Sequence, residues 1–246
     1  MALCRLLEAE GANTLRLPAL EIRPLKNRRA MADQLSALDN FDVIIFTSAN
    51  SVRFGVSFLD QRRDLPLAAI GPATARGLNQ AGYRVAINPG EASPNDAFDT
   101  ESLLSHPRLA HVSGHRILII KGSGGRQLLQ QELAQRGAAV TSVDVYERVP
   151  SQPAETALTQ ALEWLAAAEI RAITATSLAT GEALLNMATP ALRVEFERAH
   201  WLVPNERVAS GLHGLGLKAP LLQTDSPADQ DLVAALIRWR SSVSGA

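Results

Sequence analysis

A loop with two cations and three glycines follows an apolar run that has the length of a β-strand. The run spans residues 116–120 (RILII), and the loop at 121–126 reads KGSGGR. Glycine amides and cations at the start of a helix favour an anion. The candidate anion-binding residues are Lys121, Gly122, Ser123, Gly124 and Arg126. The spacing is not that of a P-loop, because the lysine precedes the glycines, and GxGxxG is absent. A tight strand-to-helix turn with surface cations is the alternative interpretation.

Hydroxyl side chains follow other apolar runs in the same way. Thr47-Ser48 and Thr176-Ser177 come directly after such runs, and Thr74 lies in the turn Gly71-Pro72-Ala73-Thr74. As helix N-caps, such side chains contribute roughly 1 kcal/mol each. A cap leaves other N–H groups of the first helical turn free, so capping and anion binding can coexist. We expect capping to be the dominant role of any single one, and substrate binding to be shared among them.

Tyr146 is the residue that could supply a proton. It is one of only two tyrosines and lies in the strand-like run at 140–146. Its phenol could donate a hydrogen bond to a ligand, or its ring could simply pack against a helix. Other catalytic patterns are missing from the sequence: there is no HExxH and no Ser/His/Asp arrangement, and the five histidines are scattered. The sequence therefore indicates no metal, no covalent nucleophile and no cofactor.

Composition narrows the class of protein. The chain has 246 residues, 46% of them hydrophobic, and a net charge of −1, so it is long enough for one large or two small domains. The balanced charge argues against a nucleic-acid-binding protein. Cys4 is the only cysteine, which excludes a disulfide framework. With no long apolar run and no signal-peptide pattern, we expect a cytoplasmic protein that does not bind membranes.

Strand-like and helical patterns alternate along the chain. Apolar runs of strand length lie at 41–46, 67–70, 83–87, 117–120 and 140–146. Helical patterns at 73–81 and 126–136 follow two of these runs, and each ends at a glycine. Strand, short loop, helix and strand in this order predict an α/β fold with parallel sheets and helices on both faces.

The second half of the chain repeats the pattern of the first. The stretch DVIIFTS at 42–48 resembles RAITATS at 171–177, an offset of 129 positions. Pro72 and Pro204 match at a similar offset, and Ser-Pro precedes a helical pattern in both halves. This order of matches predicts two similar α/β units in one chain. A chance similarity of common α/β patterns is the alternative.

Two proline-containing stretches interrupt the alternation, at 17–26 and 144–150. Each is typical of an edge strand, and paired they would form a two-strand bridge. The bridge would connect a continuous domain at 27–143 with a discontinuous domain formed by 1–16 and 151–246. Ligands of open α/β sheets bind outside the carboxyl ends of the strands, so we expect the two domains to enclose a cleft.

Four segments together resemble the uroporphyrinogen-III synthase family, the cyclases of tetrapyrrole biosynthesis. They read FDVIIFTSANSV, LAAIGPATARGL, ILIIKGSGGRQLLQQELAQRGAAVTSVDVYERVP and SPADQDLVAAL. The similarity runs from about Leu6 to Arg238, and the order and spacing of the segments carry it. The resemblance implies two α/β domains on a two-strand bridge. It also implies a hydro-lyase that needs no cofactor and cyclises hydroxymethylbilane to uroporphyrinogen III, with inversion of the terminal ring and loss of water.

The resemblance also implies roles for particular residues. The substrate carries an acetate and a propionate on each pyrrole, so dispersed N–H donors and a few cations suit it. The tyrosine considered as proton donor in the family matches Tyr146, and the threonine of its GxAT turn matches Thr74. Where some relatives repeat GPTTA, this chain has VPNERVA. Asn205 and Glu206 stand at the threonine positions, so the role of those threonines is not assigned to them. The chain also begins inside the helix that follows the family's first strand, so we expect the discontinuous domain to lack that strand.

Partners and alternatives follow from the same resemblance. We expect a monomer that takes its linear tetrapyrrole substrate from the enzyme that forms hydroxymethylbilane. The alternative function is a two-domain protein that binds small anions without catalysis. A phosphate-handling transferase fits less well, because the loop spacing is wrong and no carboxylate for Mg²⁺ is evident.

Overall fold

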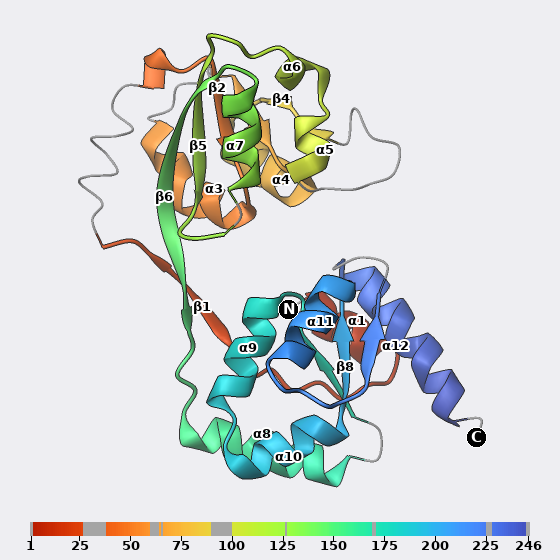
Figure 1. Ribbon diagram of the computed structural model, residues 1–246. Coiled ribbons are helices and arrows are strands. Elements are labelled where there is room, and N and C mark those ends of the chain that lie inside the picture. Colours follow the sequence, from red (N-terminus) through yellow and green to blue (C-terminus); the bar gives the residue numbers. More distant parts are fainter. Residues whose placement is uncertain are drawn as a thin grey trace. The chain divides into compact units, whose positions relative to one another are not determined.

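The computed structural model describes residues 2–26, 38–59, 64, 66–89, 100–125, 127–168, 171–224 and 228–244. The chain divides into two compact units (Figure 1). Unit 1 consists of Met1–Glu21 with Pro150–Ala246, and unit 2 consists of Ile22–Val149. The predicted α/β class with parallel sheets is confirmed, whereas the predicted domain limits and the cleft stay predictions.

Unit 2 contains a sheet with helices on its two faces. Its strands are β1 (Leu20–Pro24), β2 (Val43–Phe46), β3 (Leu67–Ala69), β4 (Val85–Ile87), β5 (Arg116–Gly122) and β6 (Ala139–Pro150). Its helices are η1 (Leu38–Asn40), α3 (Ala49–Gly55), η2 (Val56–Leu59), α4 (Pro72–Gln80), α5 (Thr100–Leu104), α6 (Pro107–Ala110) and α7 (Leu128–Gln135). The strand order is β1-β6-β5-β2-β3-β4, and each pair from β6 to β4 is parallel. The five apolar runs identified in the sequence are therefore β2 to β6.

The sheet of unit 2 is buried on both faces, as a parallel sheet requires. Ile44, Phe46 and Ile120 belong to a core cluster that includes residues of α3 and α4. The alternate residues Ile45 and Ile119 belong to a second cluster that includes residues of α5, α6 and α7. Consecutive side chains of a strand point to opposite faces, so each apolar run contributes to both clusters. This explains why the strands are continuous apolar runs.

Strand β6 is longer than the sequence indicated. The run at 140–146 and the connecting stretch at 144–150 form one strand of 12 residues, Ala139–Pro150. It lies between β5 and β1, and β1 forms the edge of the sheet. The chain passes from one unit to the other within β1 and again at the end of β6. Within unit 1, the N–H of Ser151 donates to the carbonyl of Ala19 (2.9 Å), which joins the two segments.

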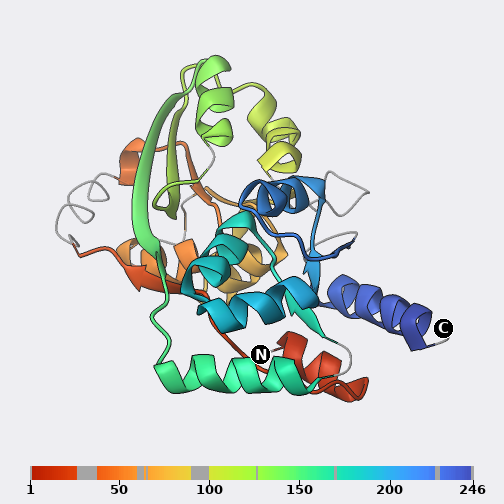
Figure 2. The ribbon, with the colours of Figure 1, turned by 60° about the horizontal axis from the view of Figure 1, so that its bottom comes forward.

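Unit 1 contains a smaller parallel sheet. Its strands, in the order β7-β8-β9, are β7 (Ala172–Thr174), β8 (His200–Val203) and β9 (Leu221–Gln223). Its helices are α1 (Ala2–Ala9), α8 (Glu155–Ala167), α9 (Leu178–Met187), α10 (Pro190–Arg198), α11 (Glu206–Gly214) and α12 (Asp229–Ser244). Helices α8 and α10 pack side by side, as do α1 and α12 (Figures 1 and 2). None of the helices described in either unit is long and apolar enough to cross a membrane.

The two faces of the small sheet differ in the number of apolar side chains that are buried against them. Trp201 and Val203 join a large cluster with residues of α8 to α11. On the other face, Leu202 forms a small cluster with Leu232 and Ala235 as its buried members among the described residues, and with partly buried neighbours from α1, β9 and α12. Strand β7 is partly exposed along its length, which is unusual for a parallel strand. The face under α12 is therefore the weaker part of this unit.

This difference predicts unequal stability of the two units. We expect the amides of β7 and β9 in unit 1 to exchange with solvent faster than those of β2 and β5 in unit 2, because local opening exposes less apolar surface. Native-state hydrogen exchange followed by mass spectrometry or NMR measures this directly. Equal protection of the two sheets would contradict the prediction.

Candidate active site

The carboxyl ends of the parallel strands of unit 2 bring most of the predicted residues to one edge. Phe46, the last residue of β2, lies beside Ile120 of β5 and beside Ala69 of β3. Gly122, the last residue of β5, lies beside Tyr146 of β6. Thr47 and Ser48 after β2, the turn at 71–74 after β3, and the end of β5 beside Tyr146 therefore meet at this edge. Open α/β sheets bind ligands at such an edge.

A register shift determines where Tyr146 points. Lys121 pairs with Asp144, but the next residue, Gly122, pairs with Tyr146, so β6 contains one residue more than β5 at this point. With strict alternation Tyr146 would face the opposite side from Val145. The extra residue instead places both in the cluster that includes residues of α3. A β-bulge thus turns the phenol toward the start of α3.

Gly122 makes room for the tyrosine ring. A Cβ atom at Gly122 would lie 2.4 Å from Cζ and 2.8 Å from Oη of Tyr146, closer than any side chain allows. The ring of Phe54 lies on α3 with its centroid 6.0 Å from that of Tyr146. Tyr146 is only 1% exposed. Its ring therefore belongs to the core of unit 2.

Two side chains bind the phenolic oxygen of Tyr146. The Oγ of Ser48 lies 3.1 Å from it, and either hydroxyl can be the donor. Nη2 of Arg148 donates to it at 2.8 Å, and the guanidinium carbon lies 5.2 Å from the ring centroid. Sequence reasoning missed Arg148. Its position two residues after Tyr146 on a strand, and thus on the same face, is the signal that could have identified it.

Ser48 has two roles at the start of α3. Its Oγ accepts a hydrogen bond from the N–H of Ser51 (2.9 Å), and its own N–H donates to Oγ of Ser51 (3.1 Å), which forms a capping box. The predicted cap is confirmed. The hydroxyl hydrogen remains available for Tyr146 or a ligand. The N–H of the preceding Thr47 donates to the carbonyl of Ile120 (3.2 Å), which extends the sheet.

The start of α4 offers backbone donors. Gly71 is its N-cap and forms no side-chain capping bond, with Pro72 following as the first helical residue. Free N–H groups at a helix start favour anions. Thr74, in the first turn of α4, is 3% exposed, so its side chain is buried in the protein and does not lie on the surface. The predicted anion contact at this turn thus depends on backbone groups more than on the threonine hydroxyl.

The ammonium group of Lys121 is engaged within its own loop. It lies 2.9 Å from Oδ1 of Asp144 and donates to the carbonyls of Gly122 (3.3 Å) and Gly124 (3.2 Å). An ammonium has three N–H donors, so all three have acceptors here. In this structure Lys121 orders the loop, and a direct contact with a ligand stays a prediction.

The glycine loop has an unusual backbone. Gly124 and Gly125 have φ angles of 72° and 82°, a conformation that glycine adopts without strain. The N–H of Ser123, an exposed residue, donates to the carbonyl of Tyr146 (2.7 Å), which ties the loop to β6. Helix α7 begins at Leu128, two residues later than predicted. Arg126, predicted to bind an anion, lies outside the described residues.

Thr176 and Ser177 lie in unit 1 at the equivalent place. They follow β7, and Ser177 is the N-cap of α9, where its Oγ accepts from the N–H of Thr180 (3.2 Å). Asn205 caps α11 in the same way. Hydrogen bonds from Ser210 and Gln223 lower the pKa of Glu206, the first residue of α11.

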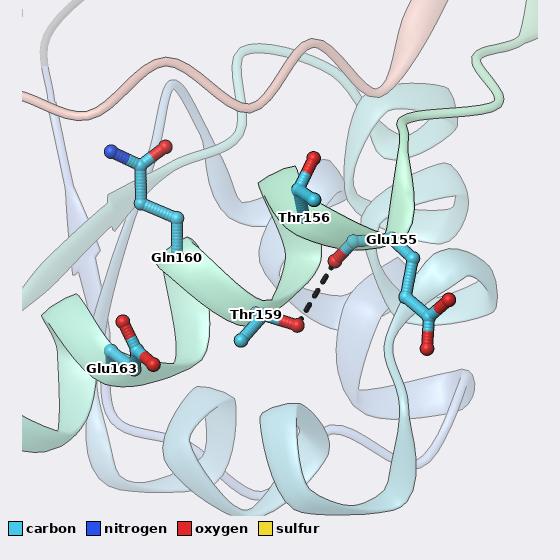
Figure 3. Close-up of a pocket in the computed structure, with 5 residues that line it drawn as sticks. All are labelled: Glu155, Thr156, Thr159, Gln160 and Glu163. Carbon is cyan, nitrogen blue, oxygen red and sulfur yellow. Dashed lines mark hydrogen bonds between the residues drawn. The ribbon is translucent and has the colours of Figure 1, made fainter.

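An open pocket lies elsewhere, on the outer face of α8 in unit 1 (Figure 3). It is lined by Glu155, Thr156, Thr159, Gln160 and Glu163. The hydroxyl of Thr159 donates to the backbone carbonyl of Glu155 (3.1 Å), as is common for exposed helical threonines. The two glutamates would repel an anion. None of the predicted residues lines this pocket, and in the described parts of the chain no group of His, Cys, Asp or Glu is arranged to hold a metal ion.

The contact between Gly122 and Tyr146 gives a testable prediction. Gly122→Ala would force the ring or the strand to move, which we expect to cost about 1–3 kcal/mol. The amides of β5 and β6 should then lose protection from hydrogen exchange, whereas Gly214→Ala, at a helical site where a Cβ has open space, should not weaken its own helix. Unchanged protection of β5 and β6 in the Gly122 variant would show that the bulge tolerates a side chain.

Comparison with known proteins identifies the family. The family model described as uroporphyrinogen-III synthase HemD matches residues 2–233. The uroporphyrinogen-III synthase of Escherichia coli K12 is 33% identical over 213 residues, which cover 81% of this chain and 80% of the relative. That of Salmonella typhimurium is 30% identical over 227 residues, 87% of each chain.

Solved structures agree with the fold. A mutant uroporphyrinogen III synthase from Thermus thermophilus has a TM-score of 0.56 at 19% identity and covers 100% of this chain and 95% of its own. The uroporphyrinogen-III synthetase of Helicobacter pylori has a TM-score of 0.61 at 14% identity, with 92% of this chain and 96% of its own covered. At such identities the structures support the fold, and the sequence matches establish the relationship. The chain belongs to the uroporphyrinogen-III synthase family.

Proposed function

We propose that this chain is a uroporphyrinogen-III synthase, a cyclising hydro-lyase that acts in tetrapyrrole biosynthesis. Its substrate is hydroxymethylbilane. The terminal hydroxyl leaves as water, the last ring is inverted, and the macrocycle closes to uroporphyrinogen III. Membership of the family over almost the whole chain supports this function. The observation that carries the site is the hydroxyl pair of Ser48 and Tyr146 at the carboxyl edge of the sheet in unit 2.

The substrate carboxylates bind mainly to neutral donors. In unit 2 these are the N–H groups at the start of α4, next to Thr74, and polar groups of the loop formed by Gly122, Ser123 and Gly124, beside the hydroxyl of Thr47. The N–H of Ser123 itself donates to Tyr146, so Ser123 contributes its hydroxyl. Arg126 adds positive charge to this loop, and Lys121, which is paired with Asp144, orders it. Unit 1 supplies Thr176 and Ser177. Many dispersed donors suit a ligand with two carboxylates on each pyrrole better than a single phosphate cradle would.

Tyr146 supplies the proton that helps the terminal hydroxyl to leave. Arginine has only donors, so the phenolic oxygen accepts from Arg148 and its own hydrogen is free to point to Ser48. Because the phenol is buried, Ser48, which is half-buried, passes the proton on: Ser48 protonates the leaving oxygen and takes the hydrogen of Tyr146. The C–O bond breaks with its electron pair on oxygen, water departs, and the pyrrole becomes an azafulvene cation. The N–H of Arg148 stabilises the negative charge left on the phenol oxygen.

The function itself is tested by product analysis. Hydroxymethylbilane closes spontaneously to the type I isomer, so the purified chain should direct the product to uroporphyrinogen III. Chromatography of the oxidised products separates the two isomers. A chain that binds the tetrapyrrole but leaves only type I product would instead be the binding protein without catalysis considered above.

Tyr146→Phe tests the proton donor. The variant keeps the ring packing against Gly122 and Phe54 and removes only the hydroxyl. A general acid contributes about 10²–10⁴-fold, and this leaving group departs readily, so we expect kcat to fall about tenfold or less, with KM little changed and more type I product. Tyr83→Phe, which removes the hydroxyl of the other buried tyrosine, is the matched control. If Tyr146→Phe turns over at the rate of the parent and gives the same isomer ratio, Tyr146 has only a packing role.

The proposal extends to the cellular setting of the reaction. The chain acts in the cytoplasm as a monomer and receives hydroxymethylbilane from the enzyme that forms it, because the free substrate is lost to spontaneous closure. Sedimentation of the purified chain tests the monomer. A higher proportion of type III product in the coupled reaction than with substrate added alone would support direct transfer.

A further inference from the structure

Arg148 combines an exposed cation with a buried contact. Arg148 lies near the end of β6 and is exposed. The Tyr146 side chain, to which it is hydrogen-bonded, is buried. One N–H of Nη2 of Arg148 donates to the phenolic oxygen at 2.8 Å. The guanidinium plane has five N–H donors, so four remain. These are available at the same sheet edge as the other candidate residues.

Lys121 and Arg171 have carboxylate partners, whereas Arg148 has none among the described residues. Lys121 is paired with Asp144, and Arg171 of unit 1 is paired with Glu195 at 2.5 Å. Within the described residues, the contacts of Arg148 are those with Tyr146. An arginine fork without an acidic partner is suited to a carboxylate from a ligand, which it can bind through two parallel hydrogen bonds.

We propose that Arg148 binds a carboxylate of the tetrapyrrole while its Nη2 stays on the phenol of Tyr146. The inference rests on the proposed function and extends it to a residue that the sequence did not indicate. Binding to the phenol holds the guanidinium in place, so less side-chain freedom is lost when the carboxylate arrives. The same guanidinium then connects a carboxylate of the substrate with the proton donor, and fixes the distance between them.

Neutral and charge-conserving variants test this role. We expect Arg148→Gln to raise KM about tenfold, the effect of losing a hydrogen-bonded charge at an exposed site. Arg148→Lys keeps the charge but cannot bind phenol and carboxylate in a fork, so its KM should rise less. The matched control is Arg53→Gln, since Arg53 is an exposed arginine stacked on the Phe54 ring (5.0 Å) in the last turn of α3. Its KM should equal that of the parent.

A binding measurement separates this inference from the proposed function. Fluorescence titration with uroporphyrin III, a stable octacarboxylate, should give a Kd about tenfold higher for Arg148→Gln than for the parent, and a weaker salt dependence. If the parent makes no type III product, the proposed function fails while this titration still decides the role of Arg148. An unchanged Kd and KM in Arg148→Gln, or an equal loss in Arg53→Gln, would overturn the inference. A fall in kcat alone would also overturn it, because it would restrict Arg148 to supporting Tyr146.

Discussion

The extra residue in β6 is the constraint on which the candidate site depends. The shift in pairing between Lys121–Asp144 and Gly122–Tyr146 turns Tyr146 to the face of the sheet covered by α3. Without it, the phenol would point to the opposite face, beneath α7, away from Ser48. β-bulges commonly re-aim a side chain next to an active site. The bulge needs Gly122 as its partner, since any Cβ there would overlap the ring.

Polar groups at this edge are used in two different ways. Some are satisfied within the protein: Lys121 by Asp144 and the loop carbonyls, and Ser51 by Ser48. Others, namely the guanidinium of Arg148 and the first backbone amides of α4, have donors without an acceptor among the described residues. The first group holds the loop and the helix start in position at no cost in unsatisfied polar atoms. The second group can donate to the carboxylates of the proposed substrate.

The two units share capped helix starts after their strands, but the sheets beneath these helices bury different amounts of apolar surface. A serine after the first strand of each parallel pair caps the next helix, Ser48 before α3 and Ser177 before α9. In unit 2 both faces of the sheet carry large clusters. In unit 1 one face is covered by α12 and α1 with few fully buried residues. Similar chain patterns therefore produce helix starts of similar geometry on sheets that differ in the apolar area beneath them.

Features that depend on neighbours along the chain could be predicted from the sequence. Continuous apolar runs predicted β2 to β6, because a parallel strand buries both faces, and serines after these runs predicted the caps of α3 and α9. Segment order was enough to indicate the family. The environment of Tyr146, whose partner Ser48 is 98 positions away, depends on the tertiary structure. So does the pairing of Lys121 with Asp144, and the lack of a carboxylate partner for Arg148 among the described residues. These outcomes depend on strand register, and one inserted residue reverses the side to which every following side chain points.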